Sequence, residues 1–86
     1  MSNRTEEAAL AGYLGKVMQE KLAQHSDTRE HWRSENRDFL MMRLIEEMKE
    51  LEAAMERGHS VIEVWREAAD VANIAAMLAD NYGGKP

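Results

Sequence analysis

Residues 44–74 read LIEEMKELEAAMERGHSVIEVWREAADVANI, and this stretch decides the fold of the 86-residue chain. On both sides of RGHS, residues 57–60, apolar side chains recur every three or four positions, which is the spacing of one helical face. Gly58 suits the left-handed residue that closes a helix, and Ser60 with Glu63 forms an S-x-x-E capping box. Two long helices joined by so short a turn pack antiparallel. The stretch therefore predicts a helical hairpin.

The rest of the chain extends this pattern to an all-α fold. Strand signals are scarce, since few β-branched or aromatic residues alternate with polar ones. We expect a single domain over residues 1–86, with a polar connection at 24–36 and helices over about 4–23, 37–56 and 61–82. The first helix carries an apolar stripe of Ala11, Leu14, Met18 and Leu22, and the second a core-facing seam of Leu40, Leu44, Met48, Leu51 and Met55.

The third helix has more apolar surface than one chain can cover. Between Ala68 and Ala79 only Asp70 and Asn73 are polar. A chain of this size also buries a small share of its surface when it folds alone. We therefore expect a four-helix-type bundle completed by homo-oligomerisation, with a homodimer or a homotetramer as the functional form.

Composition narrows the classes of partner. The net charge of −5 argues against a protein that binds nucleic acid through its phosphate backbone. The chain has no cysteine, so a disulfide framework and a thiolate metal site are both excluded. No apolar run has the length of a membrane span or the form of a signal peptide. The expectation is a soluble cytoplasmic protein without a nucleic-acid or membrane partner.

Two acidic pairs flank the predicted turn. Glu47 and Glu50 are three residues apart and share one helical face, and Glu67 and Asp70 repeat this spacing on the next helix. Both pairs adjoin apolar positions and lie at similar distances from the turn. In an antiparallel hairpin the two pairs should meet side by side.

Four carboxylates in one partly buried space repel one another unless a cation is present. Magnesium takes hard oxygen ligands, usually a few carboxylates together with water or phosphate oxygens. The pairs therefore predict a Mg²⁺ site, with Mn²⁺ as the alternative metal. The competing interpretation is a solvated acidic face, because acidic residues three apart on a helix are common.

The same residues carry a resemblance to a known family. The chain reads EEMKE at 46–50 and EAAD at 67–70, with sixteen residues between them, and further motifs are MQEKL at 18–22, REHW at 29–32 and EAADVAN at 67–73. Their order and spacing resemble the MazG-like nucleotide pyrophosphohydrolases of the all-α NTP pyrophosphatase superfamily, especially its small phage-type members. The resemblance covers about residues 14–82.

The resemblance implies a hydrolase that converts a nucleoside triphosphate, often a deoxynucleotide, to the monophosphate and pyrophosphate with Mg²⁺. It implies that the metal ligands are Glu47, Glu50, Glu67 and Asp70. One of these glutamates, or the neighbouring Glu46, would take a proton from the attacking water. The sequence leaves this catalytic group open among Glu46, Glu47 and Glu50.

Five further residues are candidates for substrate binding, and each has a structural alternative. Asn73 would contact a ligand carboxylate or the nucleotide, or else its side-chain amide would form a hydrogen bond across the bundle interface. Trp32 would stack on a base or cover the end of the core. Lys21 and Arg29 would bind phosphate, and His31 would make a polar contact to substrate; all three would otherwise be solvated.

The sequence is also compatible with a second class of function. The chain would then be a non-enzymatic helical interaction module that assembles as a homo-oligomer. In that case the acidic pairs form salt bridges with Arg43, with Arg66 or with a partner chain, and metal has no effect on stability.

Overall fold

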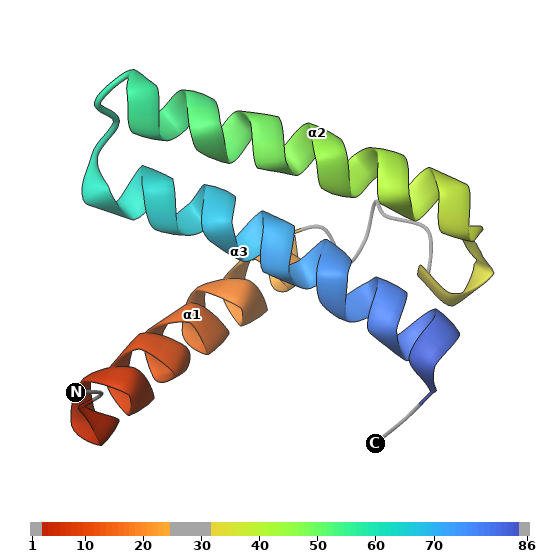
Figure 1. The fold of residues 1–86 in the computed structure, drawn as a ribbon, viewed down its shortest axis with the longest axis horizontal. Coiled ribbons are helices and arrows are strands. Elements are labelled where there is room, and N and C mark those ends of the chain that lie inside the picture. Colours follow the sequence, from red (N-terminus) through yellow and green to blue (C-terminus); the bar gives the residue numbers. More distant parts are fainter. Residues whose placement is uncertain (1–2, 25–31, 85–86) are drawn as a thin grey trace.

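The structure, a computed structural model, describes residues 3–24 and 32–84 and is all-helical in these ranges. The helices are α1 (Arg4–Gln24), α2 (Arg37–Glu56) and α3 (Val61–Leu78), with a 3₁₀ turn η1 (Trp32–Ser34) and a π-helical turn η2 (Ala79–Gly83). α2 and α3 run side by side as an antiparallel hairpin, and the C-terminal half of α1 lies across the middle of α3 (Figure 1). The predicted all-α class is confirmed.

The ends of the hairpin helices follow local chemistry that is visible in the sequence. The Asn36 side chain accepts a hydrogen bond from the Phe39 N–H at 2.8 Å and caps α2. Gly58 has a φ of 69° just after α2 ends, a conformation that glycine adopts without steric strain. The Ser60 hydroxyl accepts from the Glu63 N–H at 3.4 Å and opens α3.

The third helix ends differently from the prediction. Regular α-helix stops at Leu78 and not near Tyr82, and the chain continues as the wider turn η2. This turn is tied to η1, because Asp80 Oδ2 accepts a hydrogen bond from Trp32 Nε1 at 3.0 Å and Asn81 Nδ2 donates to the Trp32 carbonyl at 2.7 Å. Tertiary contacts with η1 therefore accompany the departure from α-helical geometry.

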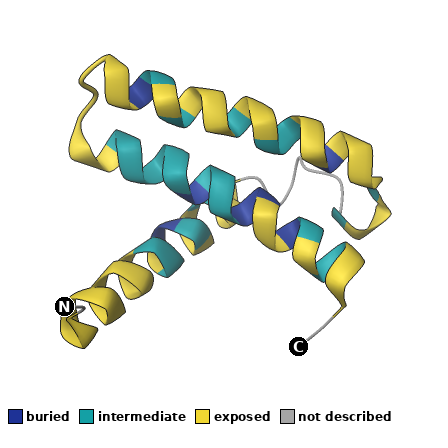
Figure 2. Cartoon of the chain, viewed as in Figure 1, coloured by how far each residue is buried: buried dark blue, intermediate teal, exposed yellow. Residues whose placement is uncertain are grey.

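Buried side chains form a small core along α3 and on the faces of α1 and α2 that pack against it (Figure 2). Its buried apolar side chains are Val17, Leu40, Ala54, Ala69, Ile74 and Met77. The predicted stripe on α1 was wrong in part, since Ala11 and Leu22 are exposed while Val17 is buried. Helix α1 is rotated so that Val17 and Lys21, one turn apart, face α3.

The predicted seam on α2 is also divided between two faces. Leu40, Leu44 and Leu51 are buried or half-buried, but the side chains of Met48 and Met55 are 53% and 58% exposed. Those two methionines continue an exposed apolar stripe that begins at Met41 and Ile45. None of the helices described in residues 3–24 and 32–84 has the length and apolar character needed to cross a membrane.

Truncating Leu40 should test how much of the stability depends on this core. Leu40 is fully buried, so Leu40→Ala removes buried apolar surface and leaves a cavity. We expect a loss of about 2 to 5 kcal/mol in the free energy of unfolding, measured by urea titration followed by circular dichroism. Leu10→Ala is the matched control, because Leu10 is 59% exposed, and it should change stability by less than about 0.5 kcal/mol. Equal losses for the two variants would contradict this core.

Candidate functional site

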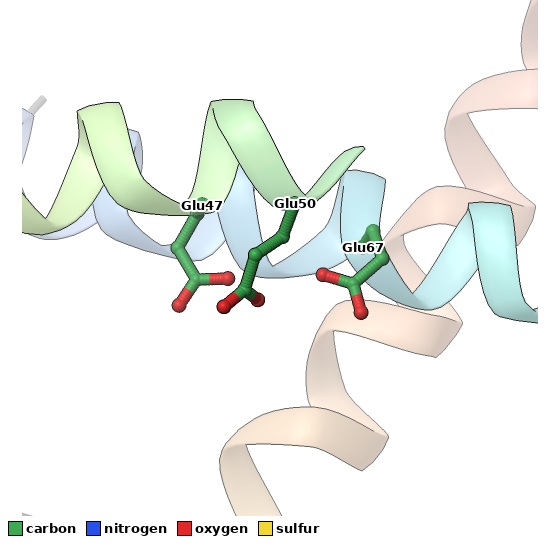
Figure 3. A group of neighbouring side chains, drawn as sticks. All are labelled: Glu47, Glu50 and Glu67. Carbon is green, nitrogen blue, oxygen red and sulfur yellow. The ribbon is translucent and has the colours of Figure 1, made fainter. Parts of the chain in front are cut away.

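Three carboxylates converge where α2 packs on α3. Glu47 and Glu50 extend from one side of α2, and Glu67 reaches the same space from α3 (Figure 3). One carboxylate oxygen of each residue lies within 4.8 Å of the others. Because residues three apart on a helix lie one turn apart on the same face, α2 presents Glu47 and Glu50 together to α3. The structure thus brings together three of the four predicted metal ligands.

Two oxygens of this cluster are buried without a partner. Glu47 Oε2 and Glu67 Oε2 accept no hydrogen bond from any residue in the described part of the chain. A buried carboxylate oxygen that lacks a donor costs free energy, and a cation or a proton is what relieves that cost. The pair of unsatisfied oxygens is therefore an observation that favours a bound cation over a solvated acidic face.

The electrostatic state of the cluster follows from burial and from like charges. Burial, together with the charges of Asp70, Glu50 and Glu67, raises the pKa of Glu47 from 4.5 to about 7, although Arg43 acts in the opposite direction. Burial is also the largest cause that raises the pKa of Glu67, followed by the charges of Glu50 and Asp70. Both shifts favour the protonated form of Glu47 and Glu67 relative to a solvated glutamate.

The fourth predicted ligand, Asp70, stands beside the cluster and has a cationic partner. Lys21 Nζ of α1 lies 3.4 Å from Asp70 Oδ2, and both side chains are only 18% exposed. On the other flank Arg43 approaches Glu47 Oε1 at 3.8 Å, within α2. Arg66, the other predicted ion-pair partner, contacts Glu63 and not the cluster. Two cations thus compensate part of the negative charge.

Not every predicted site residue joins this region. Glu46 is exposed and lies outside the group of three carboxylates. Arg29 and His31 fall outside the described residues. The alternative in which Lys21 is solvated is wrong, because its side chain is only 18% exposed and lies against Asp70.

An apolar cavity of about 220 Å³ opens on the same side of α3, further toward its C-terminus. Its lining residues come from α1, η1, α3 and η2, and they are Met18, Leu22, Trp32, Asn73, Ala76, Met77 and Asp80. Trp32 and Asn73, two predicted substrate contacts, are therefore walls of one cavity. Asn73 also forms the hydrogen bond across the bundle that was its structural alternative. Its Nδ2 donates to the Met18 carbonyl at 3.1 Å.

Sequence reasoning missed two groups of residues near these sites. Arg57 and His59 line a second cavity, of about 260 Å³, whose wall includes Glu50 and Glu67 of the cluster. Arg57 and His59 belong to the hairpin turn. Their position close to the acidic pairs in the sequence could have indicated that they lie near the cluster. Asp80 joins η1 to η2 through Trp32 and Arg33, and no local pattern indicates a contact between residues this far apart in the chain.

The cluster fits a hard divalent cation on its own chemistry. Its donors are carboxylate oxygens on two rigid helices, which is the ligand type that Mg²⁺ and Mn²⁺ prefer. The two unsatisfied oxygens belong to residues of different helices, Glu47 of α2 and Glu67 of α3. A cation held by Glu47, Glu50 and Glu67 would join α2 to α3.

Comparisons of the chain with protein-family models, with curated proteins and with solved structures found no match. The functional argument therefore depends on the residues and their arrangement.

The raised pKa of Glu47 predicts how stability depends on pH. The folded chain holds this proton more tightly than the unfolded chain between about pH 4.5 and pH 7. Ionised Glu47 therefore destabilises the metal-free fold, fully above the folded pKa and progressively less as pH falls toward 4.5. In EDTA at pH 8, Glu47→Gln should raise the free energy of unfolding by about 1 to 3 kcal/mol, because solvent screens part of the charge repulsion.

Urea titrations of both proteins between pH 4.5 and pH 8 measure this difference. It should shrink as the pH falls through that window. Glu56→Gln, at an exposed position on the same helix, is the control and should show no such trend. A Glu47→Gln variant that is less stable than the parent at pH 8 would contradict a repulsive cluster.

Proposed function

We propose that the protein is a Mg²⁺-dependent nucleoside triphosphate pyrophosphohydrolase of the MazG-like type, acting as a homo-oligomer. The observation that carries this proposal is the convergence of Glu47, Glu50 and Glu67 with two unsatisfied buried oxygens. The motif order EEMKE and EAAD on the two hairpin helices supports it. The reaction adds water across the bond between the α and β phosphates and releases a nucleoside monophosphate and pyrophosphate.

The carboxylates would hold the metal from both helices. Glu47 and Glu50 supply oxygens from α2 and Glu67 from α3, and Asp70 would join them if Lys21 turned to another anion. Bound Mg²⁺ supplies neutralisation of phosphate charge and a lowered pKa for water. Once Lys21 has left Asp70, its ammonium group could bind the phosphate groups of the nucleotide. This is the substrate-binding role that the sequence predicts for Lys21.

A carboxylate of this chain must also accept the proton that the attacking water loses. Glu47 and Glu50 lie in the cluster, whereas Glu46 is exposed and outside it. This placement favours Glu47 or Glu50 over Glu46 for that step.

The arrangement along α3 supports an orientation for the nucleotide. Glu67, Asp70 and Asn73 follow at intervals of three residues and share one face of the helix. The acidic residues stand at one end of this face and the apolar cavity with Trp32 at the other. A nucleotide whose phosphates meet the carboxylates would direct its base toward that cavity, where an aromatic ring is available for stacking.

The exposed stripe on α2 supports the proposed homo-oligomer. Met41, Ile45, Met48 and Met55 lie on one side of the helix at three- and four-residue intervals, interrupted only by Glu52. A contiguous apolar surface of this kind is a feature of protein interfaces. A second copy packed along this stripe would complete a four-helix arrangement around the two hairpins.

A helical interaction module without catalytic activity is the second candidate. The ion pairs Lys21–Asp70 and Arg43–Glu47 favour it, because they satisfy part of the acidic cluster without metal. This candidate leaves Glu47 Oε2 and Glu67 Oε2 unexplained. We therefore rank it below the hydrolase.

Pyrophosphate release is the direct test of the hydrolase. A panel of ordinary and modified nucleoside triphosphates, incubated with Mg²⁺ or Mn²⁺, should include at least one that yields the monophosphate and pyrophosphate. Glu67→Gln and Asp70→Asn should each lower kcat by about 100-fold or more, since each removes a charge that the metal requires. Circular dichroism checks that helix content is unchanged, and Glu56→Gln serves as the matched control. Folded protein that releases no pyrophosphate from any substrate would exclude the hydrolase.

Thermal melting separates the two candidates without a substrate. A cation that binds only the folded chain raises the melting temperature, so the hydrolase predicts a shift with Mg²⁺ that Glu67→Gln reduces. The interaction module predicts identical melts with Mg²⁺ and with EDTA.

A charged residue introduced into the exposed apolar stripe of α2 tests whether this stripe forms the interface of the homo-oligomer. Met48→Lys should shift the protein toward monomer in analytical ultracentrifugation, because a lysine in the middle of an apolar contact must lose its hydration. Leu10→Lys places the same charge at an exposed position on α1 and should leave the assembly unchanged. A parent protein that sediments as a monomer at high concentration would contradict the proposed assembly.

A further inference from the structure

The cavity of about 260 Å³ at the hairpin turn borders the carboxylate cluster directly. Glu50 and Glu67 of the cluster form one part of its wall, and Arg57 and His59 of the turn form another. Two alanines of α2 complete the lining, and their side chains are too short to fill the space between the acidic and the basic groups. The cavity therefore places candidate metal ligands and a guanidinium group around one volume.

The order of residues on α2 explains how this cavity forms. Glu47, Glu50, Ala54 and Arg57 follow at intervals of three and four residues, so they lie along one face of the helix. The step from Glu50 to Arg57 is about 10 Å along the helix axis, at 1.5 Å per residue. Ala54 lies between them, so this face carries only a methyl group between the carboxylate and the guanidinium. The same face thus holds acidic residues, a gap and a cation in that order.

The positive charge of Arg57 is not compensated by a carboxylate. In the described part of the chain its guanidinium forms no ion pair and no side-chain hydrogen bond. The other two cations next to the cluster differ in this respect, because Lys21 contacts Asp70 and Arg43 contacts Glu47. A guanidinium group offers five N–H donors in a planar fork that matches phosphate oxygens. Arg57 is therefore available to an anion that enters the cavity.

The two cavities beside the cluster differ in the part of a nucleotide that they suit. The apolar cavity at the C-terminal part of α3 has no lysine or arginine among the described residues that line it. The cavity at the turn has Arg57 in its wall and meets the cluster at Glu50 and Glu67. In the order of the chain, Glu67 lies between the turn and Asn73 of the apolar cavity. An anionic chain fits the cavity at the turn, and a planar base fits the other.

We propose that the cavity at the hairpin turn binds the pyrophosphate end of a nucleoside triphosphate, and that Arg57 is a phosphate-binding residue in it. The inference rests on the proposed function, in which the base is directed to the apolar cavity and the phosphates meet the carboxylates. The β and γ phosphates would then extend past the cluster toward Arg57. Lys21, on the other side of Glu67, would remain for the phosphate nearest the nucleoside.

Binding of inorganic pyrophosphate tests this assignment without turnover. With Mg²⁺ in about 0.15 M salt, which screens distant charges, calorimetry should detect pyrophosphate binding to the parent protein. Arg57→Gln should weaken this affinity by about tenfold, because it removes paired, charge-assisted hydrogen bonds to phosphate. Arg37→Gln removes the same charge from the exposed start of α2 and is the matched control, with an affinity equal to that of the parent.

A nucleoside monophosphate checks that the effect of Arg57→Gln is local. An arginine at the C-terminal end of a helix also interacts favourably with the helix dipole, so its removal can lower stability. dAMP lacks the β and γ phosphates and should bind the parent and Arg57→Gln with equal affinity. Equal weakening of dAMP and pyrophosphate in Arg57→Gln would contradict a site specific to the pyrophosphate end.

Hydrolysis assays on the same proteins distinguish failure of this inference from failure of the proposed function. Pyrophosphate binding that depends on Arg57, in a protein that hydrolyses no triphosphate, would support the site and exclude the hydrolase. Hydrolysis by a parent that binds no pyrophosphate, or that binds it as tightly as Arg57→Gln does, would overturn the role of Arg57 alone. A folded parent that neither binds pyrophosphate nor hydrolyses a triphosphate would overturn both.

Discussion

The packing of α2 against α3 brings several carboxylates close together, and the ion pairs and pKa shifts around them depend on this contact. The apolar side chains of the hairpin, such as Leu40 and Ile74, are buried only if the two helices lie side by side. That contact places Glu47, Glu50 and Glu67 within 4.8 Å of one another at their carboxylate oxygens. Hydrophobic burial therefore provides the free energy that holds a repulsive acidic cluster in place.

The cations in the structure compensate this repulsion only in part. Lys21 approaches Asp70 at 3.4 Å, and Arg43 approaches Glu47 at 3.8 Å. The pKa of Glu47 remains raised in spite of Arg43, because burial and three neighbouring carboxylates outweigh one guanidinium. Residual negative potential and unsatisfied buried oxygens would be relieved by a further cation, and this is the physical basis of the proposed metal-dependent reaction.

Helix α3 connects this site to the cavity next to it. Between residues 67 and 78, Glu67, Asp70 and Asn73 follow at intervals of three, and the other side chains of this part of α3 are apolar. The first belongs to the carboxylate cluster, the second pairs with Lys21, and the third bonds to the main chain of α1. Each polar residue therefore has a different environment, although all three follow one helical repeat. A substrate with a charged end and a planar, mostly apolar end would match the order of these environments along α3, from the carboxylate cluster to the apolar cavity.

The sequence by itself determined the features that depend on neighbours along the chain. The spans of α1 and α2, the start of α3, the caps at Asn36 and Ser60, the glycine turn and the spacing within each acidic pair follow from local periodicity and backbone chemistry. Tertiary structure decided how the helices are rotated against one another. It turned Lys21 toward Asp70 and exposed Met48.

Contacts between residues about fifty positions apart also produced the cavity. The Asn73 bond to Met18 and the Trp32 bond to Asp80 join α1 and η1 to the C-terminal part of α3 and η2. No local pattern encodes such pairings, because they depend on how complete helices pack. The acidic motifs were therefore predictable from sequence, whereas the unpaired acceptor of Asn73 and the cavity around it emerged only when the helices were placed together in space.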